Sequence, residues 1–149
     1  MRAVVQRVTS SQVQVDGKVI GGIDKGLNIL VAVAKGDTIE DVKLIKDKIV
    51  NLRIFEDDDE KMNLSLLDVS GELLVVSQFT LYGDCRKGRR PSFIESESGD
   101  KAKELYHALI KLLREQVIKV ETGEFGADMQ VYIQNDGPVT LLLDSKKVF

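Results

Sequence analysis

Cysteine, histidine and tryptophan are almost missing from this sequence: it has one cysteine, one histidine and no tryptophan among 149 residues. The lone cysteine, Cys85, excludes an internal disulfide and favours a reducing compartment. Cys85 and His107 together do not make the ligand set of a zinc site. No glycine-rich loop has the Walker or Rossmann spacing. The chain therefore lacks the commonest sequence signals for a metal or a nucleotide.

Long apolar runs are also absent. No stretch approaches the ~18 residues of a membrane helix, and Met1–Gln6 lacks the apolar core of a signal peptide. We therefore expect a soluble, cytoplasmic protein with no membrane partner. The net charge is −3 and the pI about 5.3, so a polyanionic partner would have to be met by a local basic patch. The length fits one domain, residues 1–149.

Several segments have the patterns of β-strands. Residues 3–8 combine apolar side chains with the polar pair Gln6 and Arg7, as in a half-buried strand, and Asp16–Gly17 separates two alternating runs. An Asp-Gly pair in this position is typical of a hairpin, because glycine accepts the positive φ of a tight turn. Residues 27–34 are apolar except for Asn28, which predicts a strand buried on both faces. The later segments predicted as strands are 53–56, 72–81, 129–133 and 139–143.

Two segments have helical periodicity. Asp37–Glu40 resembles a capping box with Asp37 as the N-cap and Glu40 as its partner. One apolar face follows it, formed by Ile39, Val42, Ile45, Ile49 and Leu52. Residues 100–117 form the second helix, with a core face of Ala102, Leu105, Leu109, Leu112 and Leu113. Many hairpin-like strands with two amphipathic helices predict an α+β domain.

Conventional nucleophile chemistry has one weak candidate pair. Cys85 and His107 could act as nucleophile and base, and Arg86 and Lys87 would favour the Cys85 thiolate. However, His107 falls in the middle of a predicted helix, off its apolar stripe, which is typical of a surface residue. A loop cysteine without a base is more often incidental. A hydrolase that uses Cys85 is therefore the weakest hypothesis.

Two charged runs each allow two interpretations. One has four cations in five positions, namely Arg86, Lys87, Arg89 and Arg90. It is either a solvated turn or a phosphate contact. The other, Glu56–Glu60, is five consecutive acids. We favour a solvated loop there over a cation site, because the run lacks the spaced oxygens and the turn glycine of a calcium loop.

The segment Asn135–Pro138 also has two interpretations. Pro138 has no backbone donor and a fixed φ, and an X-Pro bond adopts the cis form at a cost of only about 0.5–1 kcal/mol. A cis Gly137–Pro138 bond would turn two carbonyl oxygens to one side, as an acceptor for an ammonium group. On physical grounds alone, a tight turn between two strands is favoured.

Taken together, Ser77–Leu81 and Asn135–Thr140 resemble the paired signature motifs of the D-aminoacyl-tRNA deacylases, also called the D-tyrosyl-tRNA deacylase family. The resemblance extends over essentially the whole chain, including Met1–Val8, Asp16–Gly17, Arg90–Phe93, Thr122–Gly123 and Ala127–Met129. Either motif alone would be weak, but both at this spacing are specific. The resemblance implies an α+β, barrel-like or two-sheet fold of mainly antiparallel strands with two helices.

The activity that the resemblance implies is hydrolysis of the ester between a D-amino acid and the 3′ end of a tRNA. Glycine mischarged on tRNA is an implied substrate too, whereas L-aminoacyl-tRNA is rejected. This is chiral proofreading in translation quality control. No metal or other cofactor is implied. The implied partners are tRNA and a second copy of the chain, with active sites at the interface of a homodimer.

Residue roles also follow from the resemblance. Gly137 and Pro138 would enter the other subunit's active site, hold the α-ammonium group and exclude an L side chain. Ser77 and Phe79 would line the opposite wall, where backbone N–H groups stabilise an oxyanion. Gln78 would position the substrate or water.

Three roles stay open at this point. Thr80 is either a nucleophile or, as we prefer without a nearby histidine, an orienting donor for an attacking water. Phe125 either stacks on the terminal adenine or packs in the core. The four cations Arg86, Lys87, Arg89 and Arg90 become candidate tRNA contacts. A non-catalytic tRNA-binding module of the same fold is the alternative function.

Overall fold

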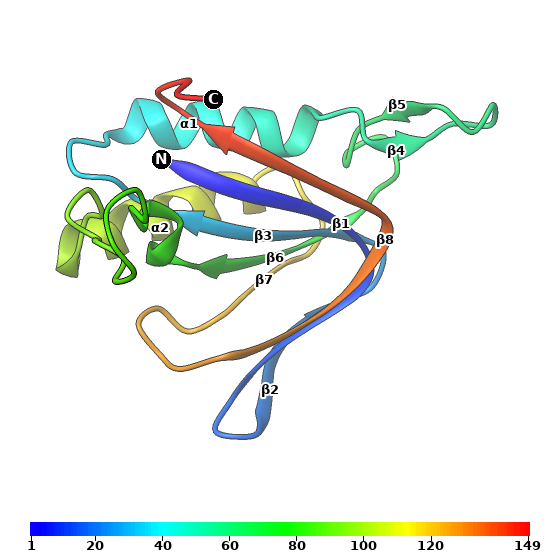
Figure 1. Cartoon of the computed structure of the whole chain (residues 1–149). Coiled ribbons are helices and arrows are strands. Elements are labelled where there is room, and N and C mark those ends of the chain that lie inside the picture. The colour runs from blue at the N-terminus through cyan, green and yellow to red at the C-terminus, as the bar shows by residue number, and fades with distance from the viewer.

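The computed structural model describes all residues, Met1–Phe149, as a strongly bent sheet with two helices on one side (Figure 1). The elements in chain order are β1 (Arg2–Val15), β2 (Lys18–Ile23), β3 (Gly26–Ala32), α1 (Ile39–Asn51), β4 (Phe55–Glu56), β5 (Met62–Leu64), β6 (Glu72–Ser77), the 3₁₀ turn η1 (Phe79–Tyr82), α2 (Gly99–Arg114), β7 (Val120–Thr122) and β8 (Gln130–Asp144).

Strand β1 organises the sheet. On one edge its first half pairs with β3 and its second half with β2, while its other edge pairs with β8 along nearly its whole length, all antiparallel. The predicted hairpin between β1 and β2 is confirmed, with φ of 49° at Asp16 and 74° at Gly17. Both positive values are those that a tight hairpin turn requires.

The sheet continues from β3 to β6 and β7 through parallel pairings and bends back toward β2. The backbone of β2 comes so close to β7 that a Cβ on Gly21 would lie 2.9 Å from the carbonyl oxygen of Thr122. Strands β4 and β5 form a separate small hairpin. The predicted α+β, mainly antiparallel and barrel-like fold class is thereby confirmed.

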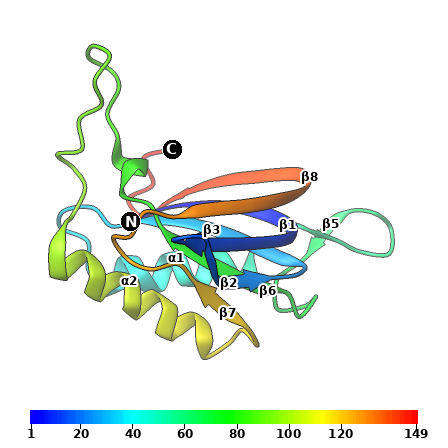
Figure 2. The ribbon, with the colours of Figure 1, turned by 90° about the horizontal axis from the view of Figure 1, so that it is seen from below.

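Helices α1 and α2 lie side by side against one face of the sheet (Figure 2). Val42, Ile45 and Ile49 of α1 are buried in the main core, as predicted, but Ile39 is exposed. The predicted capping box is shifted by one residue: the N-cap is Thr38 and its partner is Asp41. Asp37 is instead buried, where its carboxylate accepts the N–H of Ala34 and pairs with the amino group of Met1. Neither helix is long and apolar enough to cross a membrane.

Two predicted strand boundaries were wrong. The strand predicted over 72–81 ends at Ser77, and the chain then turns into η1. It ends there because its partner β3 ends at Ala32, so no strand edge is left to pair with. The two strands predicted over 129–133 and 139–143 are one continuous strand, β8, that runs through Pro138.

Candidate functional site

A pocket of about 670 Å³ lies where β3 and β6 end, next to the start of α2 and the segment 125–131. Four of the predicted site residues line it, namely Ser77, Gln78, Phe79 and Phe125. The walls also include Val31, Tyr106 and Met129, which the sequence analysis did not single out. These three come from a strand, a helix and a loop, so no local motif connects them.

The polar wall of the pocket is the transition from β6 to η1. Residues 73–76 of β6 are fully buried apolar side chains, which fix the strand in the core. The N–H of Gln78 donates to the carbonyl of Val31 at 2.8 Å, and the first turn closes when the N–H of Leu81 donates to the carbonyl of Gln78. The N–H groups of Phe79 and Thr80 therefore have no partner within the turn. Such groups can donate to an anionic oxygen.

Gln78 and Thr80 contact each other at this wall: the Gln78 Nε2 donates to the Thr80 Oγ1. An amide does not accept a proton at neutral pH, so this contact can orient the Thr80 hydroxyl but cannot activate it as a nucleophile. His107 is exposed on α2 and Cys85 is exposed in a loop, as predicted for incidental residues. Neither residue lines the pocket.

The apolar wall is built from aromatic rings. Phe125 is half-buried and packs at 5.6 Å against the ring of Tyr106, whose hydroxyl donates to the buried carbonyl of Val75 at 2.8 Å. Burial raises the pKa of Tyr106, so it stays a neutral phenol. On the opposite side, Phe79 and Phe93 pack edge to face at 5.1 Å. Phe79 is still 56% exposed, which leaves its ring available to a ligand.

The second motif does not lie at this pocket. The Gly137–Pro138 bond is cis, and the segment lies beside Arg7, whose Nε donates to the carbonyl of Asp136 at 3.3 Å. Arg7 pairs across the sheet with Leu27, whereas Ser77 pairs with Val31. Along β3, the two registers are therefore four residues apart, roughly 13 Å. Gly137 and Pro138 thus lie in the middle of β8, level with the start of β3, whereas Ser77 lies at the end of β6, next to the end of β3 (Figure 1).

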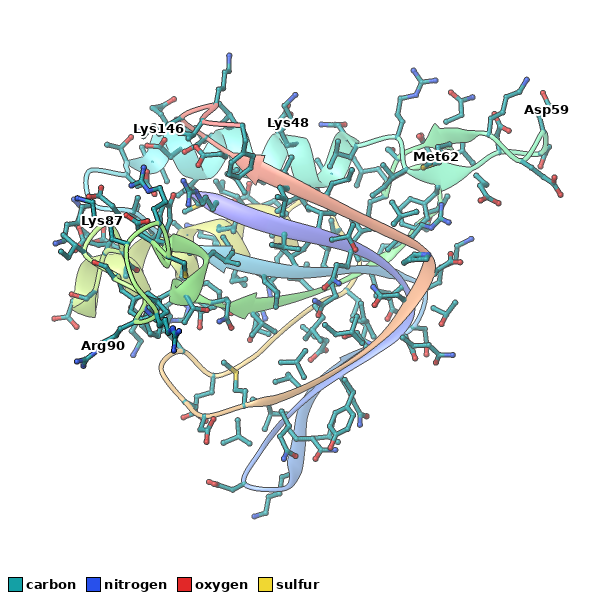
Figure 3. The ribbon with its side chains drawn as sticks, viewed as in Figure 1. Lys48, Asp59, Met62, Lys87, Arg90 and Lys146 are labelled. Carbon is teal, nitrogen blue, oxygen red and sulfur yellow. The ribbon has the colours of Figure 1, made fainter.

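The four cations of the basic run lie on a projecting loop (Figure 2). Its base is a two-residue ladder in which Asp84 and Ser92 exchange backbone hydrogen bonds. Arg86 pairs with Asp84 at 2.8 Å, and this contact lowers the pKa of the Asp84 carboxyl. Lys87, Arg89 and Arg90 are exposed and form no ion pair. Lys87 and Arg90 are labelled in Figure 3. Three cations on this loop are thus available to an external anion.

The acidic run lies at the other end of the molecule, in the hairpin of β4 and β5 (Figure 3). Asp57 accepts the backbone N–H groups of Asp59 and Lys61 and the amide of Asn63, and these bonds lower its pKa. Asp57 therefore closes the turn. No group of three or more histidine, cysteine, aspartate or glutamate side chains is gathered so that it could bind a metal ion.

Solved structures share this fold over nearly the whole chain. One, described as a c-Myc DNA unwinding element binding protein, is 41% identical with a TM-score of 0.92, over 97% of this chain and 98% of that chain. Another, described as a probable eukaryotic D-amino acid tRNA deacylase, has a TM-score of 0.82 over 95% of this chain and 97% of that chain. At 18% identity the second likeness shows the fold alone. Both structures therefore have the architecture of this chain over nearly its whole length.

Sequence comparison identifies the family. The model of the D-Tyr-tRNA(Tyr) deacylases matches residues 4–144. Proteins named D-aminoacyl-tRNA deacylase from Clostridium botulinum strains Eklund 17B and Loch Maree are each 66% identical over all 149 residues, covering both chains completely. The chain belongs to the D-Tyr-tRNA(Tyr) deacylase family, and it is an enzyme of the hydrolase class.

Proposed function

We propose that the protein removes D-amino acids from tRNA by hydrolysing the ester bond, and that the pocket at the ends of β3 and β6 is where this occurs. The observation that supports this site is the wall from Ser77 to Thr80, which carries two N–H groups without partners in the turn. It lies in a chain of the deacylase family. Residues 1–149 would act as one catalytic domain.

In the proposed reaction, the ester carbonyl lies against the N–H groups of Phe79 and Thr80. Water adds to the carbonyl carbon, and the two N–H groups stabilise the negative charge that develops on the carbonyl oxygen. The bond between this carbon and the ribose oxygen then breaks, and the ribose oxygen takes up a proton. Gln78 and Thr80 orient the water, and the neighbouring ribose hydroxyl assists. This assignment fits the segment from Ser77 to Thr80, which offers donors but no base.

Chiral selection is assigned to Gly137 and Pro138 of the partner subunit. Their carbonyl oxygens would hold the α-ammonium group, and the bulk of the pair would block the direction of an L side chain. A D side chain would point away from the pair. Glycine has no side chain to exclude, so glycyl-tRNA should also be hydrolysed.

A homodimer is part of this assignment, because within one chain Gly137 and Pro138 lie level with the start of β3, away from the pocket at its end. Strand β8 carries Gly137 and Pro138 and pairs only with β1, so its outer edge is free for a second chain. Tyr132 and Leu142 on this strand are 49% and 60% exposed. An exposed apolar edge strand of 15 residues is typical of an interface.

Binding of the tRNA is assigned to two regions. Lys87, Arg89 and Arg90 would contact backbone phosphates, and Arg86 would do so less because Asp84 already pairs with it. Phe125 borders the pocket and could stack on the terminal adenine. Its packing against Tyr106 is compatible with that role, since only one ring face is needed for each contact. A protein with this substrate would work in the cytoplasm.

The decisive assay compares matched D-tyrosyl-, L-tyrosyl- and glycyl-tRNA. We expect release of D-tyrosine and glycine without release of L-tyrosine. Equal release of the two tyrosine enantiomers would contradict the chiral assignment. Binding of tRNA without any turnover would instead support the alternative, a tRNA-binding module. Full activity of Cys85→Ala would exclude a hydrolase that depends on Cys85.

A further inference from the structure

Arg2 connects the end of β8 to the turn η1. Its Nε donates to the Asp144 Oδ2 at 2.7 Å, and its Nη1 donates to the carbonyl of Leu81 at 3.2 Å. Its guanidinium carbon also lies over the ring of Tyr82, 4.5 Å from the ring centroid. One side chain thus contacts two consecutive residues of the turn that carries the polar wall of the pocket.

On its other side, Arg2 is anchored to Asp144, which is held in a fixed position. The Asp144 side chain is 2% exposed, and its Oδ1 accepts the backbone N–H of Lys146 at 2.7 Å. Arg2 and Asp144 are also direct partners in the pairing of β1 with β8. Because both ends of this ion pair are held by the sheet, the guanidinium has a fixed position from which to hold Leu81 and Tyr82.

The turn has few other attachments. The N–H of Gln78 bonds to Val31 at its beginning, and the remaining recorded backbone bonds run within the turn or into it from Gly83. Burial and the nearby carboxylates of Asp37 and Asp144 raise the pKa of Tyr82, so this ring stays neutral as the platform for the guanidinium. Phe79 also packs on Phe93 and the Tyr82 side chain is buried, but Arg2 is the one side chain outside the turn that donates a hydrogen bond to it.

We propose that Arg2 is a positioning residue for the hydrolytic reaction: by holding Leu81 and Tyr82, it aims the N–H groups of Phe79 and Thr80 into the pocket. This inference rests on the proposed function of the pocket. Arg2 itself is not among the residues that line the pocket, so it acts through η1. Its loss should lower kcat, because misaligned donors stabilise the oxyanion poorly, while KM for the tRNA changes little.

The test compares Arg2→Met and Arg2→Lys with the wild-type enzyme in steady-state hydrolysis of D-tyrosyl-tRNA. We expect Arg2→Met to lower kcat at least about tenfold with KM within about twofold. Arg2→Lys keeps the charge near Asp144 but lacks the planar fork, so it should recover only part of kcat. The matched control is Lys119→Met, which removes a partly exposed ion pair to Glu72 away from the turn. It should leave kcat unchanged.

Amide NMR spectra of the same variants separate positioning from general stability. We expect Arg2→Met to shift the amide signals of Phe79, Thr80 and Gly83 far more than Lys119→Met does. A purely structural role predicts a lower Tm, an unchanged kcat for the folded protein and no localised shifts, and this outcome would overturn the proposal. If the wild-type enzyme released no D-tyrosine, the proposed function would fail, yet the NMR comparison would still report whether Arg2 orients η1.

Discussion

At the scale of single residues, Gly137 and Thr80 give the most specific expectations about the site. Gly137 has a φ of +117°, and a Cβ at this position would lie 2.9 Å from the Cγ2 of Val139 and 3.3 Å from the Nη2 of Arg7. Both neighbours belong to the same chain. The constraint on Gly137 therefore exists before any substrate or second subunit is present.

We expect Gly137→Ala to lower kcat/KM for D-tyrosyl-tRNA by about 100-fold or more, because the segment must shift to accommodate the methyl group. The measurement is the initial rate of release of labelled D-tyrosine. Gly17→Ala is the matched control, since Gly17 also has a positive φ but has no atom within 4 Å of its added Cβ. Gly17→Ala should lower the free energy of unfolding and leave the rate of D-tyrosine release unchanged. A near-normal rate for Gly137→Ala would remove this segment from the site.

The Thr80 hydroxyl has a different role in each of two mechanisms: it orients the attacking water or it is the nucleophile. If its hydroxyl only orients the water, Thr80→Ala should retain kcat within about tenfold of the wild-type value, because the N–H groups of the backbone remain. If the hydroxyl is a nucleophile, the loss should exceed about 10³-fold. Single-turnover hydrolysis of D-tyrosyl-tRNA distinguishes these outcomes. Trapping of an acyl-enzyme on the wild-type protein would also contradict the orienting role.

At the scale of secondary-structure elements, the sequence predicted most helices and strands but missed where two strands end. An alternating or apolar pattern continues past Ser77, yet the strand stops because its neighbour stops, and this is a tertiary property. Pro138 predicted a break between two strands. Strand β8 nevertheless continues, because its pairing with β1 has a register shift between Gln6 and Val8. A proline on a free edge at such an irregularity removes no ladder hydrogen bond.

The start of α1 gives a prediction about pH. Burial raises the pKa of Asp41, but hydrogen bonds from Lys146, Ser145 and Thr38 outweigh it, so the net shift is below the ordinary value of 3.8. A carboxyl whose pKa is lowered on folding stabilises the protein above its unfolded pKa and loses this contribution as the pH falls. The difference in unfolding free energy between wild type and Asp41→Asn should be constant from about pH 8 to pH 5 and shrink below about pH 4.

Urea denaturation at a series of pH values measures this difference. A difference that stays constant down to about pH 3 would show that the Asp41 carboxylate contributes no pH-dependent stability.

The projecting basic loop is the element that should decide affinity for tRNA. The variant Lys87→Ala/Arg89→Ala/Arg90→Ala should raise the Kd and reduce the slope of log Kd against log salt, by about 0.7–0.9 for each lost phosphate contact. Filter binding between low and high salt measures the slope. The control removes three exposed cations elsewhere, Lys18, Lys103 and Lys111, and so has the same net charge. Equal effects of the two variants on Kd and on the salt slope would mean that the loop is a solvated turn and not a specific tRNA contact.

At the scale of the whole molecule, one chain keeps the two sequence motifs apart. Ser77, Gln78 and Phe79 line the pocket and the exposed Thr80 follows them, but Gly137 and Pro138 lie in the middle of β8, away from the pocket. Periodicity and turn signals report local structure, so they gave no information on this separation. The other pocket walls, such as Val31 and Tyr106, come together only through long-range packing. No local pattern could have indicated them.

Subunit mixing tests whether the two motifs meet across an interface. One inactive variant carries Gly137→Ala, and the other carries Gln78→Ala with Thr80→Ala. If each site combines motifs from two chains, half of the randomly mixed dimers contain one intact site, so about a quarter of wild-type activity should return. The measurement is D-tyrosyl-tRNA hydrolysis after unfolding and refolding the variants together. If mass spectrometry shows heterodimers but no activity returns, each active site must take both motifs from the same subunit.

The pairing of β1 with β8 joins Arg2 to Asp144, so β1 cannot complete its pairing until β8 has been synthesised. During synthesis, β1 can pair with β2 and β3 soon after these emerge, but one whole edge stays open until β8 has left the ribosome. Contacts between such distant residues form slowly, since a long loop must close first. The nascent chain therefore presents an unpaired edge for most of its synthesis. We expect the sheet to be completed only after β8, the strand that carries Gly137 and Pro138, has emerged.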